Sequence, residues 1–174
     1  TCLEFLFHGD PAVVPVTSAL PDPMLDANSL KLIPYNVTTA IDSFAVQIVV
    51  SNVGRTLSRP LEINAERLLP NGTTQTKRLI LPRIFYRDTV KVYFPVDRFN
   101  GVGQNRVVVI LDDYFQIDEM SESNNQQTIN FTISSTEIFP VYPNNFALHK
   151  QSPLVLKAST GNPFEQTQSY LFQL

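Results

Sequence analysis

The stretch FAVQIVVSNVG, Phe44 to Gly54, decides the fold of this chain. Large apolar side chains recur at every second position, at Phe44, Val46, Ile48 and Val50. Successive residues of an extended chain point to opposite sides of a sheet, so a period of two places these side chains on one face. The stretch therefore predicts a strand that buries one face, and it does not fit a helix.

Further segments along the chain repeat this pattern. LKLIPY and TQTKRLILP also resemble strands, and LKLIPY ends at a proline, which is typical of a sheet edge. Turn sequences such as Pro70-Asn71-Gly72 and RFNGVGQN separate the segments. We expect these other residues to face inward: Leu61, Ile63, Ala65, Val90, Val92, Phe94, Val96, Val107, Val109, Leu111, Ile129, Phe131 and Ile133.

About seven strands with one apolar face each predict an all-β chain. Two sheets must pack face to face to bury those faces, so we predict an immunoglobulin-like two-sheet β-sandwich with partial flanking segments. We place the sandwich at residues 30–135. Residues 1–16 would be the remnant of an upstream domain, residues 17–29 an exposed Pro- and Asp-containing linker, and residues 136–174 the start of a following β-domain.

The two ends of the chain and its later segments suggest a piece of a longer polypeptide. The chain starts at Thr1, and QSYLFQL at the other end resembles a strand, as does LVLKAST before it. Edge strands that have lost their neighbours can pair between copies, so we also expect an edge-strand dimer.

Composition excludes several function classes. The 174 residues carry a net charge of −3 with a sequence pI of about 5.3, which argues against a nucleic-acid surface. The single cysteine, Cys2, excludes an intrachain disulfide and a Cys-based zinc site, and no apolar run could span a membrane. We interpret the scattered basic residues as a solvated face: Arg55, Arg59, Arg67, Lys77, Arg78, Arg83, Arg87 and Lys91.

The acidic stretch around QIDEMSESNN, residues 116–125, has two interpretations. Calcium requires six to eight converging oxygens, and five carboxylates are candidates: Asp112, Asp113, Asp118, Glu119 and Glu122. However, no glycine lies between Gly103 and Gly161 to bend such a loop. We favour a turn between strands with its carboxylates in water, in which the amides of Asn124 and Asn125 satisfy turn backbone groups.

No catalytic residue is predicted. Cys2 and His8 invite a nucleophile–base interpretation, but His follows Cys, whereas in the caspase-like pattern it precedes it by a long interval. His149 has no partner histidine nearby in the sequence, and we interpret it as a surface residue.

Several aromatic residues offer a further choice: Phe85, Tyr86, Tyr93, Tyr114 and Phe115. They would form either a platform for sugar stacking or part of the core and cross-strand packing, and we favour packing. Tyr114 and Phe115, beside the acidic stretch, are the candidate ligand-binding pair.

The segments VQIVVSNVG and VVVILDDYFQIDEMSESNNQQTINFTI resemble the bacterial cell-adhesion-related domain, CARDB. The resemblance spans about residues 30–135, with an N-x-G turn at Asn52-Val53-Gly54. It implies an immunoglobulin-like module of an extracellular, multidomain bacterial protein that spaces or adheres without catalysis. The acidic motif, with its isoleucine one position off the commonest spacing, is carried by Asp113, Ile117, Glu119, Glu122, Asn124 and Asn125.

The flanks carry a second resemblance. HGDPAVVPV is similar to the end of the catalytic domain of gingipain-type, caspase-like cysteine peptidases. FPVYPNNFALHKQSPLVLKAST resembles the next β-domain of exported proteins tied to type IX secretion. The resemblance implies neighbouring domains of the same polypeptide as partners, a cell-surface protein or glycan as a further partner, and an extracellular or cell-surface location. Alternatively, His8 to Pro15 would help an upstream peptidase to bind its substrate.

Overall fold

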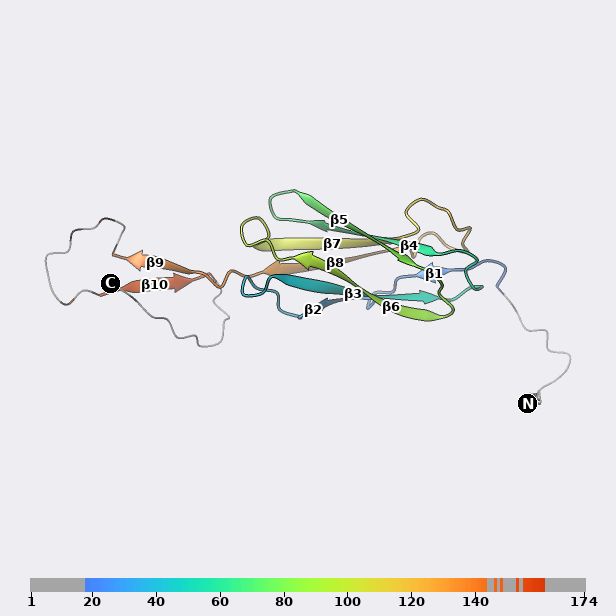
Figure 1. Cartoon of the computed structure of the whole chain (residues 1–174), viewed down its shortest axis with the longest axis horizontal. Helices are drawn as coiled ribbons and strands as arrows, with labels where there is room; N and C mark the ends of the chain where they lie inside the picture. The colour runs from blue at the N-terminus through green and yellow to red at the C-terminus, as the bar shows by residue number, and fades with distance from the viewer. Residues whose placement is uncertain (1–17, 144–145, 147, 149–152, 154, 162–174) are drawn as a thin grey trace, which may run out of the picture.

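The computed structural model describes residues 18–143, 146, 148, 153 and 155–161. Cys2, His8 and His149 therefore lie outside the described residues. The described chain is all-β, and its strands form two packed antiparallel sheets and a separate two-stranded ribbon (Figure 1). The predicted immunoglobulin-like sandwich is confirmed. Among the described residues, no helix has the length and apolarity to cross a membrane.

The first sheet is built around the alternating apolar stretch Phe44 to Gly54. Strand β3 lies at its centre, β6 pairs with one side of it, and β1 and β2 follow one another along the other side. The bounds are β1 Pro23–Met24, β2 Leu30–Ile33, β3 Ser43–Asn52 and β6 Arg87–Pro95.

The second sheet has the order β5-β4-β7-β8, all antiparallel. Its strands are β4 Leu61–Leu68, β5 Thr74–Leu81, β7 Gly103–Leu111 and β8 Gln126–Ile133. The chain passes from one sheet to the other between β3 and β4, between β5 and β6, and between β6 and β7. These crossings hold the two sheets face to face.

The core lies between the sheets and consists of the predicted inward faces. Phe44 joins the two sheets, because its ring stacks with Phe94 of its own sheet at 6.0 Å and meets Phe131 of the other edge-on at 5.2 Å between ring centroids. The predicted inward residues are buried, except that Val90 and Ile129 are only partly buried against the same cluster. Both lie on edge or near-edge positions, where cover from the opposite sheet is incomplete.

The segment predicted to be an exposed linker is in part built into the sandwich. Pro23–Met24 pairs with the end of β3, and Leu25 lies in the core with 4% of its surface exposed. The backbone N–H of Leu25 donates to the carbonyl of Asn124 at 2.9 Å. The composition of residues 17–29 did not predict this pairing, because prolines and aspartates are common at a sheet edge as well as in a linker. The domain limits themselves stay a prediction.

A short parallel contact links the start of the sandwich to its end. The N–H of Thr39 donates to the carbonyl of Ser134 at 3.0 Å, and the N–H of Ser134 donates to the carbonyl of Val37 at 3.3 Å. Thr38 and Ser134 form the corresponding parallel bridge. Strand β2 thus pairs with β3, and the residues after it, Val37 to Thr39, pair with Ser134 after the end of β8.

Beyond the sandwich, β9 (Ile138–Tyr142) and β10 (Lys157–Thr160) form an antiparallel ribbon that extends from one end (Figure 1). Strand β10 falls within the predicted strand LVLKAST, whereas β9 was not predicted as a strand. The predicted strand QSYLFQL lies outside the described residues. The assignment of residues 136–174 to a following domain stays a prediction.

The interpretation of the basic residues as solvated is wrong for Arg67, which has no exposed surface. Its position in β4 faces inward, in register with Leu61, Ile63 and Ala65. Its guanidinium lies over the Phe44 ring at 5.1 Å and donates to Asn105, Gln75 and the carbonyls of Pro95 and Val96. Burial lowers the pKa of Arg67, while the charge of Asp97 acts in the opposite direction.

Candidate functional site

Three segments meet at one end of the sandwich, which we call the loop end. They are residues 19–22 before β1, residues 53–60 between β3 and β4, and the acidic loop, residues 112–125 between β7 and β8. Backbone bonds tie them together: Arg55 N–H donates to Leu20 carbonyl at 2.9 Å, and Met120 N–H donates to Pro21 carbonyl at 3.0 Å. Connections of this kind, held by a rigid scaffold, are where β-sandwiches place binding residues.

Asn52 and Gly54 fix the first of these junctions. The Asn52 side-chain oxygen accepts from the N–H of Asp22 at 2.9 Å and of Gly54 at 3.2 Å, and its amide donates to the carbonyl of Arg55 at 2.8 Å. A Cβ on Gly54 would lie 2.4 Å from the carbonyl oxygen of Leu20. Only glycine permits this close approach of two backbones. The N-x-G turn therefore anchors the N-terminal segment to β3.

Asp112 begins the acidic loop and is buried, contrary to the expectation that its carboxylate lies in water. Its φ of 44° is in the left-handed region, which Asp tolerates better than most residues. Its carboxylate accepts from the N–H of Ile117 at 2.7 Å, and its carbonyl accepts from the N–H of Phe115 at 2.9 Å. This turn carries Ile117 into the core, where it is 5% exposed.

Two more carboxylates of the loop converge on Asn125, which is 5% exposed. The Asn125 amide donates to Glu119 at 2.9 Å and to Glu122 at 3.0 Å, while Asn124 donates to Asp22 at 2.9 Å. The two asparagine side chains thus bind carboxylates, whereas backbone partners were expected. Their main-chain carbonyls, by contrast, do accept from backbone groups. The Asn124 carbonyl accepts from the N–H of Leu25, and the Asn125 carbonyl accepts from the N–H of Leu111.

This part of the loop holds more acceptors than donors. Glu119 Oε1, Asn124 Oδ1 and Asn125 Oδ1 are buried without a hydrogen-bond partner. Burial, together with the charges of Glu122, Asp112 and Asp22, raises the pKa of Glu119 to about 7, although the hydrogen bond from Asn125 acts in the opposite direction. The Glu119 carboxyl therefore changes its charge near neutral pH.

The other two candidate carboxylates point elsewhere. Asp113 accepts from the Asn64 amide on β4 at 3.2 Å, on the outer face of the second sheet, and Asp118 lines a surface hollow with Arg55. Across the part of the chain that the structure describes, no group of three or more His, Cys, Asp or Glu side chains is placed so that it could hold a metal ion. The five calcium candidates are thus dispersed over four different surroundings.

The expectation that these aromatic residues lie in the core is wrong, although Tyr114 and Phe85 pack against Arg78 and Arg83 at the surface. Tyr114 is 52% exposed and Phe115 is 72% exposed, and Phe85, Tyr86 and Tyr93 are similarly open. They do not form a single platform, because Tyr93 faces out from the first sheet, whereas the Tyr114 hydroxyl binds Arg78 of the second at 2.6 Å. Tyr93 faces outward on β6, and the other four lie on the connections between β5 and β6 and between β7 and β8.

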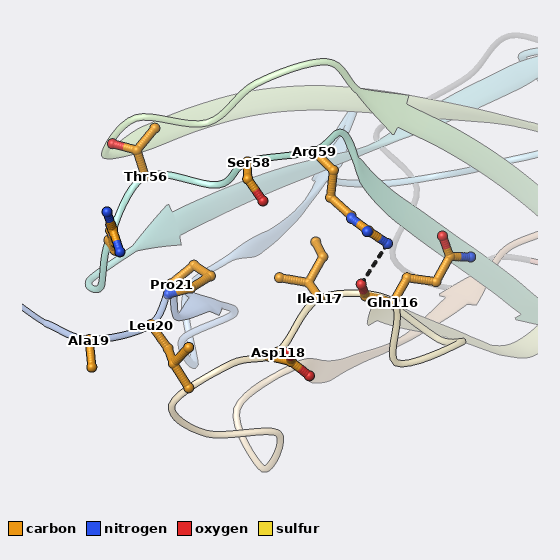
Figure 2. A pocket seen from close by; sticks show the side chains of 10 residues that line it. Ala19, Leu20, Pro21, Thr56, Ser58, Arg59, Gln116, Ile117 and Asp118 are labelled. Atoms are coloured by element: carbon orange, nitrogen blue, oxygen red, sulfur yellow. Dashed lines mark hydrogen bonds between the residues drawn. The ribbon is translucent and has the colours of Figure 1, made fainter.

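The loop end also contains a hollow of about 460 Å³. Figure 2 shows Thr56, Ser58 and Arg59 on one wall and Ile117 with Asp118 on the other, with residues 19–21 alongside. The Arg59 guanidinium donates to the carbonyl of Gln116 at 2.8 Å, so it bridges two walls. The lining of the hollow is mostly polar, with Leu20, Pro21 and Ile117 as the larger apolar members.

Sequence reasoning missed Arg55, Arg59 and Asp22 as members of this end. The prolines around Asp22 were a sign of a turn, but they did not show that Asp22 meets Asn124, which lies 102 positions later. Arg55 directly follows the N-x-G turn and Arg59 comes four residues later, and this position was the available signal.

The chain has limited similarity to known proteins. No protein-family model and no curated protein matches it. Among the solved structures that are similar to it, two are of the CARDB domain of the PF1109 protein from Pyrococcus furiosus. The crystal structure, in complex with di-metal ions, is 16% identical with a TM-score of 0.49 over 72% of this chain and 98% of that chain. The solution NMR structure is 16% identical with a TM-score of 0.46 over 66% and 95%.

Both similar structures belong to the domain type that the sequence motifs resemble. Because identity is low and the TM-scores stay below one half, the fold assignment rests on the strand pairing and core described above.

Proposed function

We propose that this chain is a non-catalytic module that spaces or docks the neighbouring domains of a larger exported protein. The observation that carries the proposal is that the polypeptide enters and leaves the sandwich at opposite ends. Residues 19–21 lie beside residues 116–118, past the end of β7, whereas Ile133 pairs with Gly103 at the start of β7 (Figure 1). Flanking segments are thereby held apart.

The separation follows from strand length. Strand β7 has nine residues, which at roughly 3.3 Å per residue spans about 30 Å. The core between the sheets makes this a stiff length, because close-packed interiors resist compression. A spacer needs no more than such a rigid rod with its attachments at the two ends.

The parallel contact between Thr39 and Ser134 suits a load along that rod. Because the two segments run in the same direction, pulling the ends apart shears both hydrogen bonds at once instead of opening them in sequence. The Thr39 hydroxyl adds a further contact, since it accepts from the N–H of Thr136 at 2.8 Å. The start and the end of the sandwich are therefore clamped to each other.

The wider setting is part of the proposal. The resemblance of HGDPAVVPV to gingipain-type peptidases, and of the later flank to type IX secretion proteins, supports a module outside the bacterial cell beside a peptidase domain. The accessory-peptidase alternative depends on His8 to Pro15, which lie outside the described residues.

A peptidase assay tests the non-catalytic role. The purified chain is incubated with a panel of fluorogenic peptides, with Cys2→Ala and His8→Ala as matched variants. We expect no hydrolysis above buffer. Hydrolysis by the unmodified chain that disappears in either variant would refute the proposal.

A second candidate function is a carbohydrate-binding adhesion module, favoured by the hollow at the loop end. The calcium form of this candidate has less support, because Asp113 binds Asn64, the pair Glu119–Glu122 binds Asn125, and Asp118 lines the hollow apart from them. A titration with a saccharide distinguishes the spacer from the binding module, since a pure spacer gives no saturable response.

A further inference from the structure

We propose that the hollow at the loop end binds a small acidic saccharide, whose carboxylate is received by the guanidinium groups of Arg55 and Arg59. The inference rests on the second candidate function and names its ligand class. It is independent of the spacer role, because the spacer depends on the ends of the sandwich and not on a ligand.

Both arginines of the hollow have donors that a bound anion could use. They lie four positions apart on the same connection, and both line the hollow. Within the described residues, the Arg55 guanidinium makes no hydrogen bond or ion pair, and Arg59 uses one nitrogen on the Gln116 carbonyl. Guanidinium groups bind carboxylates through pairs of parallel hydrogen bonds, so free donors here favour a carboxylate ligand.

The remaining lining suits the neutral part of a sugar. Thr56 and Ser58 offer hydroxyl groups, and Asp118 across the hollow can accept from a sugar hydroxyl (Figure 2). Ile117 is 5% exposed and gives an apolar contact beside Leu20 and Pro21. At about 460 Å³ the hollow has the size range of small-molecule sites.

The walls are already in place before any ligand binds. Three hydrogen bonds each join two of the three segments. They run from the Arg55 N–H to the Leu20 carbonyl, from the Met120 N–H to the Pro21 carbonyl, and from the Arg59 guanidinium to the Gln116 carbonyl. A site whose shape is fixed loses less conformational entropy on binding. A nucleic-acid strand is a poor occupant of the hollow. It would need an extended basic stripe, and two arginines opposed by Asp118 do not form one.

An NMR titration of the full chain tests the inference. Sodium glucuronate, glucose and sodium sulfate are each added at constant ionic strength, and backbone amide shifts are followed. We expect glucuronate to give saturable shifts confined to residues 19–21, 55–59 and 116–118, and glucose and sulfate to bind at least about tenfold more weakly. No saturable shift with glucuronate into the high millimolar range would overturn the inference.

Variants separate the arginines from a general charge effect. The double variant Arg55→Gln, Arg59→Gln is expected to weaken glucuronate binding about tenfold or more. Arg106→Gln, an exposed arginine toward the start of β7, is the matched control and should bind as the unmodified chain does. Equal binding of sulfate and glucuronate, or of glucose and glucuronate, would overturn the acidic saccharide as ligand. Unchanged amide shifts elsewhere show that each variant is folded.

Discussion

The two ends of the sandwich both bury charged groups, but they satisfy them to different extents. At the arginine end, around Arg67 and Asn105, five hydrogen bonds use the five N–H donors of one guanidinium. At the loop end, Glu119, Asn124 and Asn125 each keep a buried oxygen without a donor. One end is a closed network, and the other has an excess of acceptors.

The difference shows what each end can do. A network with every donor paired rigidifies the fold, since any change leaves a buried group without its partner. An end with unpaired acceptors and a carboxyl whose pKa is raised to about 7 responds to its surroundings. We therefore expect stability to depend most on the Arg67 network, and the response of stability to pH to come from the loop end.

Replacing Arg67 should give the largest effect. Arg67→Leu removes the donors for Asn105 Oδ1 and for the carbonyls of Pro95 and Val96, and buried acceptors without donors are costly. We expect the free energy of unfolding to fall by about 3–5 kcal/mol, measured by urea denaturation. The exposed Arg106→Leu is the control. If both variants lost equally little stability, the closed network would not be what stabilises the arginine end.

Asn52 forms hydrogen bonds through both the oxygen and the nitrogen of its side-chain amide, and its replacement should have the next largest effect. Asn52→Ala leaves the buried N–H of Asp22 unpaired and removes the bond to the Arg55 carbonyl. We expect a loss of about 2 kcal/mol in the free energy of unfolding, against little change for the exposed Asn130→Ala. A loss no larger than that of the Asn130 variant would contradict the anchoring role of the N-x-G turn.

Glu119 should make stability depend on pH. Its pKa is raised in the folded chain to about 7, so the folded chain holds a proton that the unfolded chain releases between about pH 4.5 and 7. The contribution of Glu119 to stability is therefore greatest below about pH 4.5 and is lost as the pH rises through 7. The full shift corresponds to about 3 kcal/mol, and partial exposure reduces this to about 1–2 kcal/mol.

Glu119→Gln is the corresponding variant. It cannot ionise and keeps an acceptor for Asn125, so at about pH 8 we expect it to be more stable than the unmodified chain by about 1–2 kcal/mol. Urea denaturation from about pH 5 to about pH 8 measures this, with the exposed Glu137→Gln as control. A variant with the same pH dependence as the unmodified chain would show that the loop end is not responsive through Glu119.

Tyr114 should give the smallest effect. Its ring is 52% exposed, and its contacts with Arg78 are a hydrogen bond of 2.6 Å and a cation–π contact of 5.3 Å. We expect Tyr114→Ala to lower the free energy of unfolding by about 0.5 kcal/mol, because exposed pairs contribute little. A loss comparable to that of Asn52→Ala in the same urea experiment would mean that this contact is a third structural anchor.

Periodicity in the sequence predicted the sandwich because strand faces are a local property. Phe44, Val46, Ile48 and Val50 face inward as their spacing indicates, and each is at most 1% exposed. The same reasoning did not place Arg67, although it occupies an inward position of β4. Its charge suggested solvent, and the acceptors that permit its burial come from Asn105, 38 positions later, and from the end of β6.

The sequence by itself determined that two sheets with apolar inner faces pack together, because alternation along each strand leaves no other way to remove those faces from water. The tertiary structure alone decided which polar groups meet. Asp22 reaches Asn124 across 102 positions, and Arg59 reaches Gln116 across 57. Such contacts depend on how the sheets bring separate loops to one end, and a period along a single strand carries no information about that.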